Sequence, residues 1–462
     1  METKKKKMPH TLVILMGIII FAVILTWVIP SAEYTRVENA QGVKVIDPNT
    51  FNYIEKTPVN PLKVFNLAIE GFEKSAVLIT VILFSGAAFN IITKSGALQS
   101  LIGMVSRKTK SKEYLFIPIL TLIFGLICTT QGVNTFIGFA PIMVMIAIAL
   151  GFDSIVGAAI LLLGGAVGFS TGTLNVNTTI VAQEIAGLAP YSGIGFRAVC
   201  FAVFYMVTNF MLIKYAMKIK KNPELSPMYE LDKDRSYEKE GNDEFNKPMN
   251  TQKWLIISSL FLALGIIVYG GIKLKWKLDE TAAVFIWLSI VAGVIAGYSP
   301  STIAKYFVEG CKNMIGAALI IGFARTVSGV LSAGNIMDTS IHAMTQGINI
   351  FPQILKAPIM FIVNLIVNIF ITSGSGQAAA IMPIFAPLAD TVGISRQTAV
   401  LAFNFGDGFC NYILPTSTAL MGVLGATDIP YDKWMMFMGK IFGVWIVVGS
   451  VLMIAAEIIG YM

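Results

Sequence analysis

Charged residues are scarce in this chain, and their scarcity sets the first limit on its class. Asp, Glu, Lys and Arg make up only 13% of the 462 residues, whereas 55% are hydrophobic. Soluble domains carry roughly 25% charged residues, so this composition cannot cover a water-soluble fold of this size. The sequence therefore predicts an integral membrane protein. The net charge of +7 then bears on membrane topology, and we expect no nucleic acid as a partner.

Cysteine and histidine are also rare, which bears on chemistry. The four cysteines, Cys128, Cys200, Cys311 and Cys410, lie at irregular spacing in apolar stretches and are expected to be core thiols, without a disulfide framework. The two histidines flank no metal-ligand motif. The chain also lacks a Ser/His/Asp constellation and a Walker-type glycine loop. We therefore expect no enzyme, no cofactor, no resident metal and no nucleotide-driven pump.

Long apolar runs are abundant. Those long enough to cross a hydrocarbon core of roughly 30 Å predict nine transmembrane helices. They cover residues 11–29, 75–92, 155–185 (interrupted), 197–213, 254–272, 281–297, 313–331, 397–424 (interrupted) and 435–459. The first run is longer than the apolar region of a secretion signal and has no A-x-A cleavage pattern, so we interpret it as a retained helix.

Two further apolar stretches, residues 115–150 and 357–391, are too long for one helix and too short for two crossings. Each has a polar, glycine-containing segment near its middle, at residues 129–135 and 372–377. Arms of about 15 residues rise only about 22 Å, which is less than the membrane thickness. We therefore expect two re-entrant hairpins, each entering and leaving the membrane on the same side.

The placement of Lys and Arg predicts a cytoplasmic N-terminus. In that orientation 21 of the 34 basic residues fall in cytoplasmic segments and 11, Arg197 among them, in outer segments. Nine crossings then place the C-terminus outside a cell membrane. Residues 214–253 are rich in Lys, Glu, Asp, Asn and Pro and are expected to be a cytoplasmic linker between two halves.

The two halves repeat the same order of elements. Residues 60–71 align with residues 299–310, and an Ala-Pro-Ile or Met-Pro-Ile tripeptide follows each predicted hairpin tip. Residues 254–272 supply one extra crossing, so the second copy has the opposite orientation to the first. The sequence thus predicts an all-α fold of two inverted repeats, residues 1–213 and 273–462. That architecture is typical of secondary transporters.

Four polar places interrupt the predicted membrane segments: the two hairpin tips and the breaks within helices 155–186 and 397–426. Helices break in lipid only where protein or water faces the break. Polar side chains and helix N-termini there suit a substrate carboxylate, freed carbonyls suit a transient Na⁺, and Pro415 helps to hold the second helix open. Interhelical hydrogen bonding is the alternative role. The candidate ligands are Thr130, Gln131, Gly132, Asn134, Thr135, Asn175, Asn177, Thr178, Ser373, Gly374, Ser375, Gln377, Asp407, Asn411, Thr416, Ser417 and Thr418.

Two charges, Asp407 and Arg325, fall inside predicted membrane segments. A charge at the bilayer centre costs about 2.5–3.5 kcal/mol, which makes each a functional candidate. Asp407 is expected to bind a substrate ammonium group, to coordinate a coupling cation or to carry a proton. Arg325 is expected to bind a carboxylate, to pair with Asp407 or to tie helices together.

Residues 322–325, 406–411, 414–417 and 421–425 resemble the YfcC family, within the anaerobic four-carbon-dicarboxylate carrier (DcuC-like) group of the ion-transporter superfamily. The resemblance covers almost the whole chain, although members often have Asn-Pro where this chain has Asn175-Val176. It implies a homodimer in which a scaffold holds a moving transport domain. It also implies secondary transport of small organic acids or amino acids, since relatives include dicarboxylate carriers and arginine/ornithine antiporters.

The residues themselves favour a transporter of a carboxylate-bearing metabolite, with an amino acid as the leading candidate. One membrane carboxylate with few basic residues near the breaks favours a zwitterionic or cationic substrate over a dianion. A four-carbon dicarboxylate carrier is the alternative. A channel is the alternative of another class, and duplicated broken helices speak against it. The coupling ion, Na⁺ or H⁺, and the choice between antiport and symport stay open.

Overall fold

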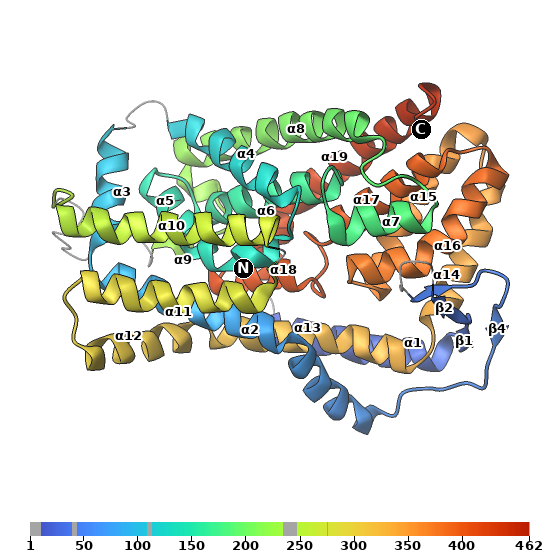
Figure 1. The fold of residues 1–462 in the computed structure, drawn as a ribbon, viewed down its shortest axis with the longest axis horizontal. Coiled ribbons are helices and arrows are strands. Elements are labelled where there is room, and N and C mark those ends of the chain that lie inside the picture. The colour runs from blue at the N-terminus through green and yellow to red at the C-terminus, as the bar shows by residue number, and fades with distance from the viewer. Residues whose placement is uncertain (1–10, 39–43, 109–112, 234–246, 275, 462) are drawn as a thin grey trace, which may run out of the picture.

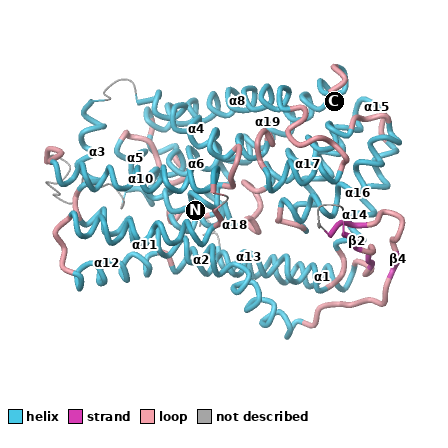
Figure 2. Tube along the Cα trace, in the orientation of Figure 1, coloured by secondary structure: helices cyan, strands magenta, loops and turns pink. Residues whose placement is uncertain are grey.

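The computed structural model describes residues 11–38, 44–108, 113–233, 247–274 and 276–461. The N-terminal lysines, His10 and the middle of the predicted linker lie outside the described residues. Helices dominate the described chain (Figures 1 and 2). This confirms the prediction of an all-α membrane protein with many crossings.

Seven described helices are long and apolar enough to cross a membrane. They comprise α2 (Val64–Lys94), α8 (Ile194–Lys221), α10 (Thr251–Lys273), α11 (Leu278–Ile295), α13 (Ile315–Ala333), α15 (Gln353–Phe370) and α19 (Tyr431–Ile458). Shorter apolar helices include α1 (Thr11–Val28) and α6 (Ser154–Ser170). The number of crossings, nine, stays a prediction.

The helix breaks lie where the sequence predicts them. In the first half, α4 (Phe116–Cys128) turns through a 3-10 segment (Val133–Phe139) into α5 (Ala140–Ala149), and α6 leads through a π-helical turn (Val176–Ile180) to α7 (Val181–Ile185). In the second half, α15 turns into α16 (Gly374–Val392), and α17 (Arg396–Cys410) is followed by α18 (Thr418–Ala426). Because α15 is itself long enough to cross a bilayer, the re-entrant path of the second hairpin stays a prediction.

Helices of the two halves pack closely on each other. The long helix α2 packs against α11, α12 (Pro300–Asn313) and α13, and α1 packs against α13 (Figure 1). Glycines allow two of these approaches. A Cβ at Gly71 would lie 2.8 Å from the Gly322 carbonyl oxygen, and one at Gly310 would lie 2.5 Å from that of Gly86. The other group of helices, α4, α6, α8, α15, α17 and α19, carries the candidate site.

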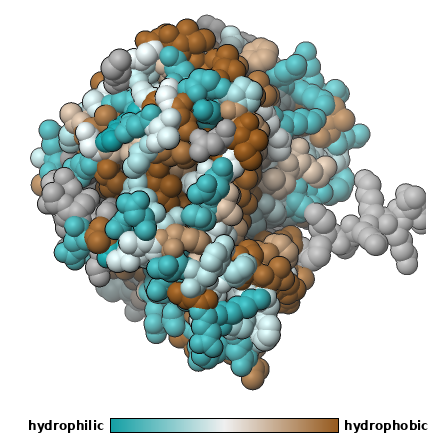
Figure 3. All heavy atoms as spheres, turned by 90° about the vertical axis from the view of Figure 1, so that its right-hand side faces the viewer, coloured by the Kyte–Doolittle hydropathy of each residue, from teal (hydrophilic) through white to brown (hydrophobic). Residues whose placement is uncertain are grey.

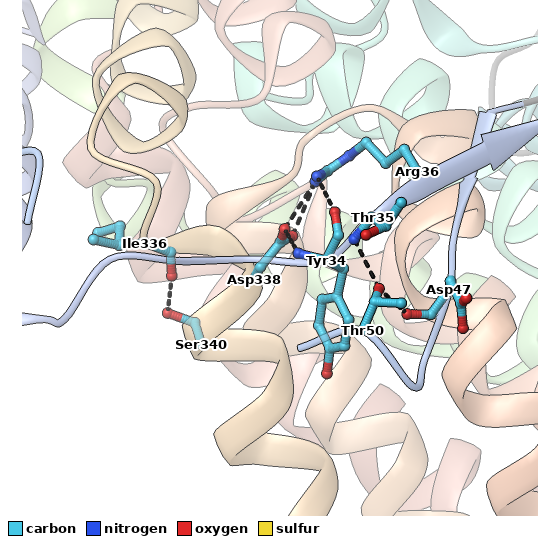
Figure 4. Close-up of polar contacts among 8 residues, drawn as sticks. All are labelled: Tyr34, Thr35, Arg36, Asp47, Thr50, Ile336, Asp338 and Ser340. Atoms are coloured by element: carbon cyan, nitrogen blue, oxygen red, sulfur yellow. Dashed lines mark hydrogen bonds and ion pairs between the residues drawn. The ribbon is translucent and has the colours of Figure 1, made fainter. Parts of the chain in front are cut away.

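The two ends of the molecule differ. At one end, β1 (Ala32–Glu33) pairs with β4 (Asn52–Tyr53) and β2 (Arg36–Glu38) with β3 (Lys44–Ile46), both antiparallel. Asp338 of α14 (Met337–Gln346) anchors this segment by accepting hydrogen bonds from Tyr34 N and Arg36 Nη2 at 3.0 Å (Figure 4). Viewed from this end, the surface mixes hydrophilic and hydrophobic residues (Figure 3). Helices α3 (Ala97–Lys108) and α12 lie at the opposite end (Figure 1).

The start of the predicted linker is ordered and docked. After α8, a short turn leads into α9 (Tyr229–Lys233). Ser226 Oγ donates a hydrogen bond to Asp153 Oδ2 at 2.7 Å, and Ser154 N donates to Asp232 Oδ2 at 2.8 Å. This part of the linker therefore caps the beginning of α6 and does not hang free.

Candidate functional site

Asp407 lies in the last turn of α17 and is almost fully buried, with 1% of its surface exposed. Its Oδ1 accepts a hydrogen bond from Asn368 Nδ2 at 2.9 Å. Its Oδ2 is buried and has no hydrogen-bond partner among the described residues. An unsatisfied buried carboxylate oxygen is costly. Asp407 therefore has one oxygen available for a cation, an ammonium group or a proton.

The tip of the second hairpin lies directly beside this oxygen. A Cβ at Gly374 would lie 2.8 Å from Asp407 Oδ2 and 2.6 Å from Thr178 Cγ2. Three elements, the end of α17, the start of α16 and the π-helical turn, thus meet at one point. Oγ1 of Thr178 is also buried without a partner in the described chain. Glycine at position 374 leaves the space that brings them together.

A network of three hairpin amides, Asn364, Asn368 and Gln377, reaches Asp407 through Asn368. Asn368 Nδ2 donates to both Asp407 Oδ1 and Gln377 Oε1 at 2.9 Å, and Gln377 Nε2 donates to the carbonyl and Oδ1 of Asn364 at 3.1 Å. All three amides are fully buried. Asn368 Oδ1 has no partner among the described residues and is a third available oxygen.

The N-terminus of α16 adds an anion-binding group. Ser373 caps this helix by accepting a hydrogen bond from Gly376 N at 3.4 Å. The amides of Gly374 and Ser375 make no hydrogen bond within the described part of the chain. Since a helix N-terminus carries partial positive charge, these amides suit a carboxylate. A site for positive charge at Asp407 and a site for negative charge thus lie side by side.

Arg197 is a candidate functional residue that the sequence reasoning missed. It lies in the first turn of α8 and is 1% exposed. Its guanidinium donates to Asn404 Oδ1 at 2.7 Å, Tyr461 Oη at 2.9 Å, and the Gly172 carbonyl and Gln397 Oε1 at 3.1 Å. All four acceptors are neutral, so a positive charge is buried at the first break without a carboxylate among these partners.

Asn404 links Arg197 to the site. Its Oδ1 accepts from Arg197, and its Nδ2 donates at 3.0 Å to Thr179 Oγ1, next to Thr178. Asn404 and Asp407 are three residues apart on α17, so they share one face of that helix. Arg197 was assigned to an outer segment because it stands at the edge of an apolar run. The sequence did carry signals for the other residues that surround Asp407. Asn364 and Asn368 stand at helical spacing in the apolar hairpin arm, and Asn404 stands close to Asp407.

The first hairpin tip contacts α10 and α18. The side chain of Gln131 occupies the space where a Cβ at Gly271 of α10 would stand. Gln131 Nε2 and Asn134 Oδ1 are buried without partners in the described chain, whereas Thr130 Oγ1 bonds the Ile127 carbonyl of its own helix at 2.9 Å. Gly132 precedes the 3-10 segment, which buries Thr135 and packs against α18. Each hairpin tip therefore packs against a broken helix of the other half.

The remaining candidates divide between the two breaks. In the second, Asn411 Nδ2 donates to the Asp407 carbonyl at 2.7 Å, and Ser417 caps α18. Pro415 lies in the turn, Thr418 begins α18, and Thr416 Oγ1 is buried without a partner in the described chain. In the first, Asn175 Oδ1 accepts from Thr178 N at 3.2 Å. Ser375 is exposed, and the side chain of Asn177 lies outside the described residues.

Arg325 is not part of this cluster. It lines a separate groove with residues of α2 and α13, and it forms no ion pair with a described residue. The expected pairing of Arg325 with Asp407 is therefore absent from the described chain.

The sequence is similar to those of known transporters along nearly its whole length. A family model described as "DcuC: C4-dicarboxylate anaerobic carrier" matches residues 8–458. The chain is 31% identical to "Putative basic amino acid antiporter YfcC" of Escherichia coli (strain K12), over 99% of this chain and 98% of the relative. It is 29% identical to an uncharacterized protein of Haemophilus influenzae, over 98% of each. The solved Alcanivorax borkumensis YdaH transporter aligns over 98% of this chain and 99% of its own at 14% identity, with a TM-score of 0.42.

Proposed function

The chain belongs to the DcuC family of C4-dicarboxylate anaerobic carriers and is a membrane transporter, not an enzyme. From this premise we propose that it carries out secondary active transport of an amino acid. A basic amino acid of the arginine or ornithine type is the first candidate substrate. The relative described as a basic amino acid antiporter supports this choice.

One observation carries the proposal: Asp407 Oδ2 is buried without a partner in the described chain, beside the free amides at the start of α16. An amino acid has the matching pair of charges. Its ammonium or guanidinium group would satisfy Asp407 Oδ2, and its carboxylate would accept from the amides of Gly374 and Ser375.

The charge balance supports a substrate without large net charge. Asp407 is an acidic group and Arg197 a basic one, and Asn404, which accepts a hydrogen bond from Arg197, lies three residues before Asp407 on α17. The buried Arg197 adds a positive group that the count from the sequence placed outside. This narrows the preference for a cationic over an anionic substrate, and it stays compatible with a basic amino acid, which carries a single net positive charge.

A four-carbon dicarboxylate is the second candidate, and a specific feature favours it besides the family description. Two Ser-capped helix N-termini occur in the region, at Ser373 of α16 and Ser417 of α18. Two such N-termini would bind two carboxylates, with Arg197 adding positive charge nearby. Asp407 would then bind the coupling cation instead of the substrate.

The coupling ion, assembly and location complete the proposal. Asp407 Oδ2, Thr178 Oγ1 and Asn368 Oδ1 are oxygen donors of the kind that Na⁺ takes, and Asp407 alone would suffice for a proton. The carrier is expected to work by alternating access as a homodimer in the cell membrane. The N-terminus would be cytoplasmic and the C-terminus outside.

The test is exchange in proteoliposomes. Vesicles loaded with ornithine should take up labelled arginine faster than empty vesicles, because a carrier is stimulated by substrate on the far side and a channel is not. We expect D407N to abolish the exchange. The matched control is D390N, since Asp390 is exposed and its ion pair with Arg396 lies at the surface. Exchange by D407N at the wild-type rate would refute the role of Asp407.

The same vesicles separate the alternatives. Loading with succinate and measuring labelled succinate uptake tests the dicarboxylate reading, and repeating each measurement with and without Na⁺ tests the coupling ion. Uptake of succinate alone, with no response to arginine or ornithine, would replace the first candidate by the second.

A further inference from the structure

Arg325 is a membrane charge that the proposed transport site does not use. It lies in the middle of α13, whose other residues are largely apolar. Its side chain is partly buried and makes no hydrogen bond or ion pair with any described residue. An arginine at this depth without a partner is expensive. Some other group is therefore expected to meet it.

The residues of α13 beyond Arg325 leave room for such a group. Ser328, Gly329 and Ser332 follow at helical spacing, so the four residues form one stripe of about 10 Å along the helix. All four line a groove of about 130 Å³, together with Glu70, Gly71 and Lys74 of α2. Neither serine hydroxyl makes a hydrogen bond within the described chain, so both can donate to a ligand.

The groove continues into a larger one toward the end of the molecule that carries the strands. A neighbouring cavity of about 510 Å³ shares Leu67 and Glu70 with the first and is lined also by Lys56 and Lys63. Together the two contain four basic side chains and one acidic one, Glu70, which pairs with Lys74 at 3.4 Å. The net positive charge fits an anionic ligand, and a guanidinium fork fits phosphate oxygens in particular.

The adjacent surface is apolar. Leu62, Phe65 and Ile69 lie on the same turns of α2 and its preceding 3-10 turn, and they are 75%, 67% and 61% exposed. These side chains suit contact with acyl chains. A ligand that carries phosphate and acyl chains together would satisfy both surfaces, whereas a soluble phosphate would satisfy only one.

From these contacts we propose that the Arg325 groove binds the phosphate headgroup of an anionic phospholipid, with the acyl chains against Leu62, Phe65 and Ile69. The headgroup phosphate would accept hydrogen bonds from the Arg325 guanidinium and from Ser328 or Ser332. This inference is independent of the proposed substrate.

The test is the unfolding temperature of the full chain in neutral detergent, titrated with dioleoylphosphatidylglycerol. Dioleoylphosphatidylcholine is the neutral-lipid arm, and glycerol phosphate is the soluble-phosphate arm. We expect only phosphatidylglycerol to raise the unfolding temperature of the wild type. The variant R325Q should need at least about tenfold more of this lipid for the same rise, because it loses charge-assisted hydrogen bonds. K440Q, which removes an exposed lysine of α19, is the control and should respond as the wild type does.

The variant R325K keeps the positive charge but loses the planar guanidinium. Its unfolding temperature should therefore rise with phosphatidylglycerol less than that of the wild type and more than that of R325Q. If R325Q does not fold, the same titration of R325K against the wild type tests the proposal. An equal response of R325Q or R325K and the wild type would overturn the assignment of the guanidinium. An equal rise with glycerol phosphate would overturn the lipid as the source. If R325Q is a smaller oligomer than the wild type in lipid-free detergent, the groove contacts a second copy of the chain and the proposal fails.

Discussion

Replacing Arg197 removes a buried charge that donates hydrogen bonds to four neutral groups. The change R197M removes a guanidinium that donates to Asn404, Gln397, Tyr461 and the Gly172 carbonyl, and it keeps much of the apolar stem. Gly172 has a φ of +61°, so the loop at the first break depends on a conformation that this hydrogen bond helps to hold.

The expected loss of stability follows from the four hydrogen-bond acceptors that R197M leaves without a donor. Each buried acceptor left without a donor costs about 1–3 kcal/mol, although Asn404 and Gln397 can turn toward other donors. Removal of the desolvated guanidinium offsets part of this cost. We expect the free energy of unfolding to fall by about 3–5 kcal/mol, which is a large share of a typical 5–15 kcal/mol. R197K should recover only part of the lost free energy of unfolding. An ammonium group lacks the planar array of donors by which the guanidinium reaches all four acceptors.

The measurement is unfolding of the purified protein followed with a denaturing detergent, with exchange measured beside it. The control is D390N, since Asp390 pairs with Arg396 at 2.6 Å on side chains that are 51% and 40% exposed, and the change leaves the hydrogen bond from Arg396 to the Ala186 carbonyl in place. Surface pairs contribute about 0–1 kcal/mol, so D390N should change the free energy of unfolding little. If R197M unfolds and exchanges as the wild type does, Arg197 does not hold the first break, and the reasoning is refuted.

Two further predictions concern the hairpin tip and the docked linker. G374A places a methyl group 2.6 Å from Thr178 and 2.8 Å from Asp407 Oδ2, so initial exchange rates should fall at least about tenfold, by occupation of the site. G316A, with nothing within 4 Å of its added Cβ, should exchange normally. For Asp153, burial raises the pKa above 3.8, while hydrogen bonds from Tyr215 and Ser226 lower it. Since the folded protein binds that proton more tightly, the stability of the wild type relative to D153N should fall as pH rises through the raised pKa and then level off. Unfolding temperatures from about pH 4 to about pH 8 would check this, and a pH-independent difference would contradict it.

Much of the fold could be predicted because lipid penalises unpaired backbone groups so strongly. Polar, glycine-containing segments in apolar runs had to be tips or breaks, and the ends of α4, α6, α15 and α17 lie within a few residues of them. Asp407 was identified for the same reason. A buried charge without an obvious partner is expensive wherever it lies.

Which helices pack against one another could not be predicted from hydropathy in the same way. Hydropathy shows that Arg325 and Asp407 lie in membrane segments but not which helices adjoin them, so their pairing was a guess that packing does not support. Arg197 was missed because it stands at the first turn of α8, where a window average assigns it to the loop. The structure buries it because the C-terminal Tyr461 and the loop at Gly172 cover that turn.

The arrangement around α17 bears on the proposed transport site, because it brings the hairpin tip and the helix break together. Gln397, Asn404 and Asp407 lie on one face of this helix, the first two bound to Arg197 and the third beside the hairpin tip. Asp407 Oδ2 is buried without a hydrogen-bond partner in the described chain, and withdrawal of the tip would let water reach it. A bound cation or ammonium group would remove that cost only while the tip is in place. A ligand shifts a conformational equilibrium by its difference in affinity for the two states, and in the proposed site that difference would arise at Asp407 Oδ2.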